Sequence, residues 1–189
     1  MLSSASAWVG LGFLLSELGL AVWRRATAAG GTADRDAGSL RLLWMVISAS
    51  ITAGVLLAVY GVHPYLPAGF PWPGLGLGVF AVGTILRWWS IRHLGRFFTV
   101  NVALAADHRV VDTGPYRWVR HPSYSGLLLQ FAGLGLTLGT LPAVAIILVP
   151  ITLALLHRIR VEETALRAHL PGSYAAYADR TKKIVPLVY

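Results

Sequence analysis

The sequence contains no cysteine and little charge. Of its 189 residues, 13% are charged and 56% are hydrophobic. Without cysteine, disulfides, thiolate metal sites and cysteine nucleophiles are excluded. An ordinary soluble domain, in which about a quarter of the residues are charged, is excluded as well. The composition predicts an integral membrane protein.

Acidic residues are the scarcer charge, 8 against 16 basic residues, which gives a net charge of +8. In a soluble chain such an excess would indicate nucleic-acid binding. Here five apolar segments come close to the length that crosses about 30 Å of hydrocarbon as a helix. They are residues 5–23, 42–62, 74–89, 124–138 and 141–157.

The basic residues all fall on one side of this five-span arrangement, because the connections 63–72 and 139–142 contain no Lys or Arg. The positive-inside rule then predicts an N-terminus outside and a C-terminus in the cytoplasm. This topology explains the positive charge without nucleic acid. The first segment lacks a basic leader, so we expect a retained anchor. Arginine makes up 14 of the 16 basic residues. Together with the richness in Ala and Gly, this indicates a GC-rich bacterial genome and therefore a bacterial inner (plasma) membrane.

The predicted fold is therefore an all-α integral membrane protein with five transmembrane helices, a cytoplasmic cap and a C-terminal helical tail. The short connection 139–142 predicts a tight hairpin between the last two spans. This hairpin brings the polar stretches 114–126 and 157–163 together at its cytoplasmic mouth.

The first stretch reads "GPYRWVRHPSYSG" over residues 114–126. Gly114 predicts a turn, and Pro122 suits the first turn of a helix. Tyr116, His121 and Tyr124 then surround a helix N-terminus, where free N–H groups favour an anionic ligand. Arg117 and Arg120 belong to the same cluster, and they suit either this site or a role as topology anchors.

The second stretch places Arg158 and Glu162 four residues apart, on one face of a helix. The next pair, Arg160 and Glu163, predicts an ordinary surface salt bridge. Farther on, Ser173 is the expected N-cap of a short helix that carries Tyr174 and Tyr177 on one face, and these tyrosines suit either the membrane interface or a ligand.

Two further features concern isolated polar groups. Glu17 lies inside an apolar segment, which indicates either a functional acid or a hydrogen bond to a neighbouring helix. The histidines form none of the short-spaced His and carboxylate motifs of metal sites, so we expect no metal.

The glycines of 74–78 and 133–139 favour helix packing rather than phosphate binding.

The stretch 114–126, followed by "RIRVEETAL", "GSYAAY" and "IVP", resembles the isoprenylcysteine carboxyl methyltransferase family. The resemblance covers about residues 87–189. It implies one membrane domain, 1–189, with N-terminal spans in 1–86 and a catalytic half in 87–189. It also implies a methyltransferase that moves a methyl group from S-adenosylmethionine to a carboxylate on a lipid-modified or lipidic small molecule at the cytoplasmic membrane face, with membrane lipids as surroundings.

Carried over residue by residue, the resemblance implies Arg158 and Glu162 as catalytic residues, with Arg158 on the substrate side. Asn101 stands where some members of the family carry glutamine. The implied cofactor contacts are Asn101, His108, Arg109, Val110, Val111, Tyr116, His121, Pro122, Ser123, Tyr124 and Glu162.

Three other interpretations stay open at this point. Phospholipid N-methyltransferases share a similar Gly-x-Tyr and Arg-His-Pro pattern, although an amine acceptor must lose a proton and so needs a base. Membrane sterol reductases resemble the C-terminal region, use NADPH and are usually longer. A non-catalytic membrane protein would keep the polar stretches only as solvated surface.

Overall fold

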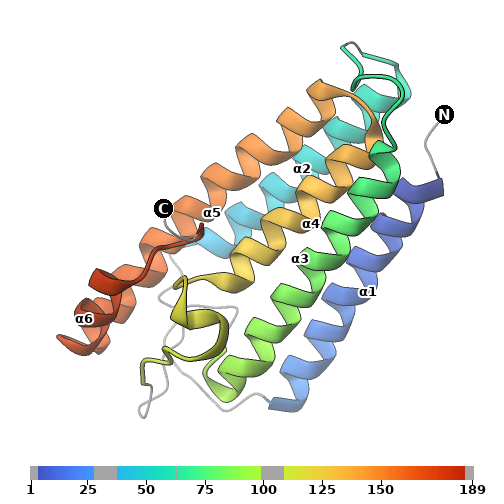
Figure 1. Cartoon of the computed structure of the whole chain (residues 1–189). Helices are drawn as coiled ribbons and strands as arrows, with labels where there is room; N and C mark the ends of the chain where they lie inside the picture. Colours follow the sequence, from blue (N-terminus) through green and yellow to red (C-terminus); the bar gives the residue numbers. More distant parts are fainter. Residues whose placement is uncertain (1–3, 28–37, 63, 99–108, 186–189) are drawn as a thin grey trace.

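The computed structural model describes residues 4–27, 38–62, 64–98 and 109–185, with the side chains of 20–27 outside the description (Figure 1). Over these ranges the protein is helical, and its only β-type pairings are two isolated bridges. The prediction of an all-α fold is therefore confirmed. The predicted cytoplasmic cap includes residues that lie outside the described ranges, so it stays a prediction.

Five long helices of the described chain run side by side (Figure 1). The shorter elements lie at one end of this bundle: two 3₁₀ turns, η1 (Gly95–Phe97) and η2 (Gly114–Arg117), and the helix α6 (Ser173–Arg180). The long helices are α1 (Ser4–Thr27), α2 (Ser39–Val59), α3 (Trp72–Leu94), α4 (Pro122–Leu138) and α5 (Leu141–His169).

Three helical segments of the described chain are long and apolar enough to cross a membrane: Ser39–Val59, Trp72–Phe97 and Leu141–His169. The helix α4 has 17 residues and packs between α3 and α5, with α1 along its other side. These three segments are consistent with the predicted membrane protein. The count of five spans stays a prediction.

Helix α5 runs on beyond the apolar span 141–157 and ends at His169, as predicted for the stretch that carries Arg158 and Glu162. Its apolar part is therefore continuous with the polar stretch that carries Arg158 and Glu162. Thr140 begins the helix as an N-cap, its hydroxyl accepting a hydrogen bond from the Ala143 N–H at 3.3 Å. The N-cap predicted for α6 is wrong, since Gly172, with φ +87°, occupies that position and Ser173 is the first helical residue.

Small residues let α3 and α4 pack with their backbones in contact. A Cβ added to Gly83 would lie 2.6 Å from the Gly126 carbonyl oxygen, and one added to Gly133 would lie 2.5 Å from that of Gly76. Such approach is possible only where neither helix carries a side chain at the crossing. Of the glycines predicted to serve helix packing, Gly76 and Gly133 are confirmed in that role, whereas Gly74 and Gly78 have nothing within 4 Å of an added Cβ.

Polar side chains join α1 to α3 inside the bundle. The Arg87 guanidinium contacts the Glu17 carboxylate at 2.9 Å and 3.1 Å, and both side chains are largely buried. The Trp88 indole N–H donates to the Ser16 hydroxyl at 2.8 Å. Of the two interpretations of Glu17, the bond to a neighbouring helix is the one observed.

The two ends of the bundle differ in chemistry. At one end, the connection after α2 meets the α4–α5 turn, where the Leu66 N–H donates to the Gly139 carbonyl at 2.9 Å. At the other end lie η2, the start of α4, the end of α5 and α6 (Figure 1). The basic residues with described side chains lie at the start of α2, from Arg87 in α3 onward to Arg120, and from Arg158 onward, so that, apart from the Arg87 side chain inside the bundle, they belong to this second end.

Candidate active site

The start of α4 forms one wall of the candidate site. Pro122 is the first helical residue, where its missing N–H costs nothing, and His121 is the N-cap. The His121 carbonyl accepts from the backbone N–H groups of Tyr124 and Ser125 at 3.0 and 3.1 Å. The rings of His121 and Tyr124 stack with centroids 5.6 Å apart.

The Tyr124 hydroxyl connects the two polar residues of α5. It donates to Glu162 Oε2 at 3.0 Å and accepts from Arg158 Nε at 3.1 Å. Arg158 and Glu162 are one helical turn apart, so one hydroxyl reaches both. The sequence expectation that these three residues meet is therefore realised in the structure.

Arg158 is held on a second side as well. Its Nη1 group donates to the Ser39 hydroxyl at 2.7 Å, and Ser39 is the first residue of α2. The arginine is 2% exposed, although it lies at the end of the bundle. Burying a guanidinium requires such hydrogen-bond partners, since an unpaired buried charge is costly.

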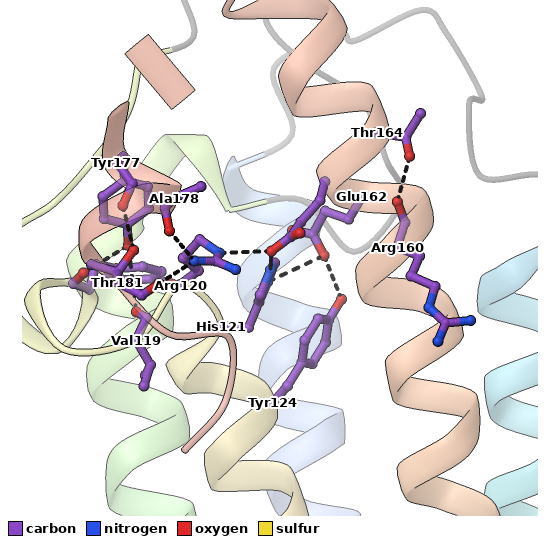
Figure 2. Close-up of polar contacts among 12 residues, drawn as sticks. Val119, Arg120, His121, Tyr124, Arg160, Glu162, Thr164, Tyr177, Ala178 and Thr181 are labelled. Carbon is purple, nitrogen blue, oxygen red and sulfur yellow. Dashed lines mark hydrogen bonds and ion pairs between the residues drawn. The ribbon is translucent and has the colours of Figure 1, made fainter. Parts of the chain in front are cut away.

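A second carboxylate, Glu163, lies behind this group. Its Oε1 accepts from Arg120 Nε at 2.8 Å and lies 3.3 Å from His121 Nε2. The other ring nitrogen, His121 Nδ1, lies 3.9 Å from Glu162 Oε2. Figure 2 shows Arg120, His121 and Tyr124 converging on the carboxylates of α5 from the start of α4.

Arg120 also fastens the end of α6 and the residues that follow it, 178–184, which we call the C-terminal strap. Its Nη1 donates to the carbonyls of Ala178, at 2.8 Å, and Thr181. Backbone bonds from Arg120 to Lys182 at 2.7 Å and from His121 to Lys183 at 3.0 Å extend the contact. The interpretation of Arg120 as a topology anchor alone is wrong, whereas Arg117 is exposed, as an anchor would be.

The strap is seated by buried tyrosines. The Tyr177 hydroxyl donates to the Tyr116 carbonyl at 2.7 Å, and the Tyr116 hydroxyl donates to the Ser90 carbonyl of α3 at 3.3 Å. Burial raises the pKa of both hydroxyls, so they remain protonated donors. Tyr174 is also buried. The tyrosines of α6 thus pack inside the protein and not at a lipid interface.

The structure gathers six of the predicted site residues at the mouth between α4 and α5: His121, Pro122, Ser123, Tyr124, Arg158 and Glu162. Tyr116 is buried close by, and the charge of Glu162 adds to the rise in its pKa. Arg109 instead lies over the ring of Phe97, 5.8 Å from its centroid, and Val110 and Val111 are half-buried in the chain that follows. Asn101 and His108 lie outside the described residues.

Sequence reasoning missed Ser39, Arg120 and Glu163. The predicted Arg160–Glu163 surface pair is wrong, because Glu163 is buried against Arg120 and His121 and Arg160 is exposed. The two adjacent carboxylates, Glu162 and Glu163, were the sequence feature that could have indicated a second buried acid. Neighbouring residues on a helix point about 100° apart, so they serve different partners. Nothing in the sequence marked Ser39, which reaches Arg158 only through the packing of α2 on α5.

The described residues include no group of three or more His, Asp or Glu side chains arranged to hold a metal ion. The fold and this site define a class: helical membrane proteins with a polar, carboxylate- and arginine-containing site at one end of the bundle.

Comparisons with known proteins agree with that class. Residues 75–168 match the isoprenylcysteine carboxyl methyltransferase (ICMT) family. Over 116 residues the chain is 34% identical to protein-S-isoprenylcysteine O-methyltransferase B of Arabidopsis thaliana, a match covering 60% of this chain and 58% of that protein. Over 114 residues it is 30% identical to the Schizosaccharomyces pombe protein-S-isoprenylcysteine O-methyltransferase, covering 59% of this chain and 48% of that protein.

A solved structure of the eukaryotic intramembrane Ras methyltransferase ICMT superposes with a TM-score of 0.63 at 24% identity, covering 77% of this chain and 52% of that one. This likeness extends the common fold beyond the matched segment. The chain belongs to the isoprenylcysteine carboxyl methyltransferase family and is an integral membrane protein. It spans about half to three fifths of the length of these relatives.

Proposed function

We propose that this chain is an S-adenosylmethionine-dependent methyltransferase that esterifies a carboxylate on an isoprenylcysteine-like or other lipidic acceptor. One observation carries the proposal. The Tyr124 hydroxyl bonds both Arg158 and Glu162 and so fixes their relative position at one end of the helical bundle. An arginine suits a carboxylate acceptor, and a carboxylate suits the cationic part of the methyl donor.

The residues at the site fit S-adenosylmethionine by the chemistry of their side chains. Glu162 is 31% exposed and can accept from the ammonium of the methionine part, while the stacked rings of His121 and Tyr124 offer a flat aromatic surface. The cofactor supplies an activated methyl group. The protein supplies alignment and exclusion of water. We include Asn101, His108, Arg109, Val110, Val111, Tyr116, Pro122 and Ser123 as further contacts on the family pattern.

Arg158 orients the acceptor in this proposal. A carboxylate is already ionised near neutral pH, so the site needs no general base to activate it. Arg158 can hold it by paired N–H donors and so point one oxygen at the methyl group. The apolar helices beside the site let a lipid chain stay in the membrane while its headgroup reacts.

An ester product is favoured over a methylated amine. Amine methylation requires a base to take up a proton, and the buried carboxylate of Glu163 is already bonded to Arg120 and His121. The named relatives are O-methyltransferases. Neither the NADPH-dependent reductase nor the non-catalytic alternative gains support from any of these observations.

We place the site at the cytoplasmic face of a bacterial inner membrane, with the N-terminus outside. The support is the collection of basic residues at the site end of the bundle. Because the chain has no cysteine, single cysteines report the topology directly. In intact cells, Ala68→Cys should react with a membrane-impermeant maleimide and Ala176→Cys should react only after lysis; the reverse pattern would contradict this orientation.

Transfer of a labelled methyl group tests the activity. Purified protein is incubated with methyl-labelled S-adenosylmethionine and N-acetyl-S-farnesylcysteine, a minimal isoprenylcysteine with a free carboxylate. We expect label in the lipid product and its release as methanol after mild base treatment, because base hydrolyses methyl esters. Base-stable label in a parallel phospholipid incubation would indicate amine methylation and would contradict the proposal. Binding of the cofactor by calorimetry gives an independent readout of the folded protein.

A further inference from the structure

We propose that Ser39, at the start of α2, is a positioning residue that orients Arg158 toward the acceptor carboxylate. This inference rests on the proposed function and deepens it. It assigns to the N-terminal part of the chain, outside the segment 75–168 that matches the family, a share in acceptor recognition.

The geometry gives Arg158 two fixed points on different elements. Nε donates to Tyr124 of α4 at 3.1 Å, and Nη1 donates to Ser39 of α2 at 2.7 Å. A guanidinium is a rigid plane with donors at set angles, so partners on two of its nitrogens determine how that plane faces. The bond at Nε fixes one direction of that plane, and the bond at Nη1 adds a second.

The hydrogen bond between Arg158 and Ser39 is buried, so water does not compete for either group. Ser39 and Arg158 are each 2% exposed. A hydrogen bond to a charged group in such surroundings contributes more than one at a surface. The hydroxyl is also small and neutral, so it orients the guanidinium and leaves its positive charge for an anionic acceptor.

The local structure of α2 holds Ser39 in place. Gly38 precedes the helix with φ +73°, a left-handed conformation that suits glycine. Farther along, α2 packs closely on α5, where a Cβ on Gly54 would lie 2.7 Å from the Ile147 side chain. Apolar contacts of this kind, and not the Ser39 hydroxyl, fasten the helix. Removal of the hydroxyl should therefore leave the bundle intact.

The test compares Ser39→Ala with Ser50→Ala, the same change at another buried serine of α2. The probe acceptor is N-acetyl-S-farnesylcysteine, and cofactor affinity is measured by calorimetry. For Ser39→Ala we expect the KM for the acceptor to rise about tenfold, as for loss of one hydrogen bond to a charged group. Cofactor affinity should stay unchanged. Ser39→Thr, which restores a hydroxyl, should recover most of the effect.

The outcomes separate the two proposals. An unchanged acceptor KM in Ser39→Ala, with wild-type turnover intact, would overturn the role of Ser39 alone. A matching KM rise in Ser50→Ala, or an equal loss of cofactor affinity in Ser39→Ala, would show a structural effect and would also overturn it. Wild-type protein that binds the cofactor yet forms no base-labile product would overturn the proposed function and this inference with it.

Discussion

The Tyr124 hydroxyl donates a hydrogen bond to Glu162 Oε2 at 3.0 Å. Because the same oxygen accepts from Arg158 at 3.1 Å, one side chain of α4 sets the spacing between two side chains of α5. The cofactor side and the acceptor side of the proposed site are therefore coupled through a single atom.

Removal of that hydroxyl should affect both sides together. In Tyr124→Phe we expect cofactor affinity to fall and the acceptor KM to rise, each about tenfold, because two charged groups lose a hydrogen bond.

Glu162→Ala should mainly weaken cofactor binding, and Arg158→Ala should mainly lower turnover. Calorimetry and methyl-transfer kinetics measure the two effects separately.

The matched control is Tyr60→Phe, since Tyr60 is 79% exposed and lies at the opposite end of the bundle. It should behave as wild type in both measurements. A Tyr124→Phe protein that changes only one of the two parameters would contradict the coupling.

The C-terminal strap depends on Arg120. In Arg120→Gln the buried carboxylate of Glu163 loses its closest cation, and two carbonyls of the strap lose a donor. We expect a loss of about 3 kcal/mol in the free energy of unfolding and faster cleavage by trypsin after Lys182 and Lys183, read by mass spectrometry.

Arg117→Gln removes the same charge three residues away, from an exposed side chain. It should change unfolding by no more than about 0.5 kcal/mol and leave the cleavage rate as in wild type. Equal effects of the two substitutions would show that net charge, and not the contacts of Arg120, holds the strap.

The Glu17–Arg87 pair gives a prediction about the bundle and not the site. Glu17→Leu leaves the largely buried Arg87 without its carboxylate, so we expect a loss of about 3 kcal/mol in the free energy of unfolding. The double variant Glu17→Leu with Arg87→Met should recover most of it, because an apolar pair of similar size removes the unpaired charge. Thermal unfolding in detergent is the measurement, and a double variant no more stable than the single one would refute this account.

The glycine contact between α3 and α4 predicts a position-specific effect. Gly83→Ala places a methyl group 2.6 Å from the Gly126 carbonyl oxygen, so the helices must separate. We expect a loss of about 1–3 kcal/mol in the same unfolding assay. Gly78→Ala, on the same helix with nothing within 4 Å of the added Cβ, is the control. It should cause no loss, and a gain of up to about 1 kcal/mol is expected because alanine favours a helix over glycine. Similar losses at both positions would show that the close approach to Gly126 is not the cause.

The long helices, and the continuation of α5 beyond its apolar part, could be predicted from the sequence. Hydropathy located each long helix because apolar runs are a local property of the chain. The apolar run of the fifth span ends near 157, and the helix continues past it to His169, as predicted. A helix does not stop where it leaves the hydrocarbon, since Arg158 and Glu162 favour helical backbone as much as the residues before them.

Only part of the site could be predicted from the sequence, because local patterns reveal some of its contacts and not others. Tyr124, Arg158 and Glu162 follow from helix periodicity and the short α4–α5 turn. The contacts of Arg120 with the strap and of Ser39 with Arg158 join residues 58 and 119 positions apart. Such contacts depend on how whole helices pack, and no local pattern encodes them.

The C-terminal strap also determines when the site becomes complete. Residues 178–184 are synthesised after all five long helices, so Arg120 and His121 acquire these backbone partners only once the last long helix has been made. A nascent chain halted after α5 would have the bundle's helices but not the segment that fastens the start of α4. Assembly of the site is thus deferred until translation of the helices has finished.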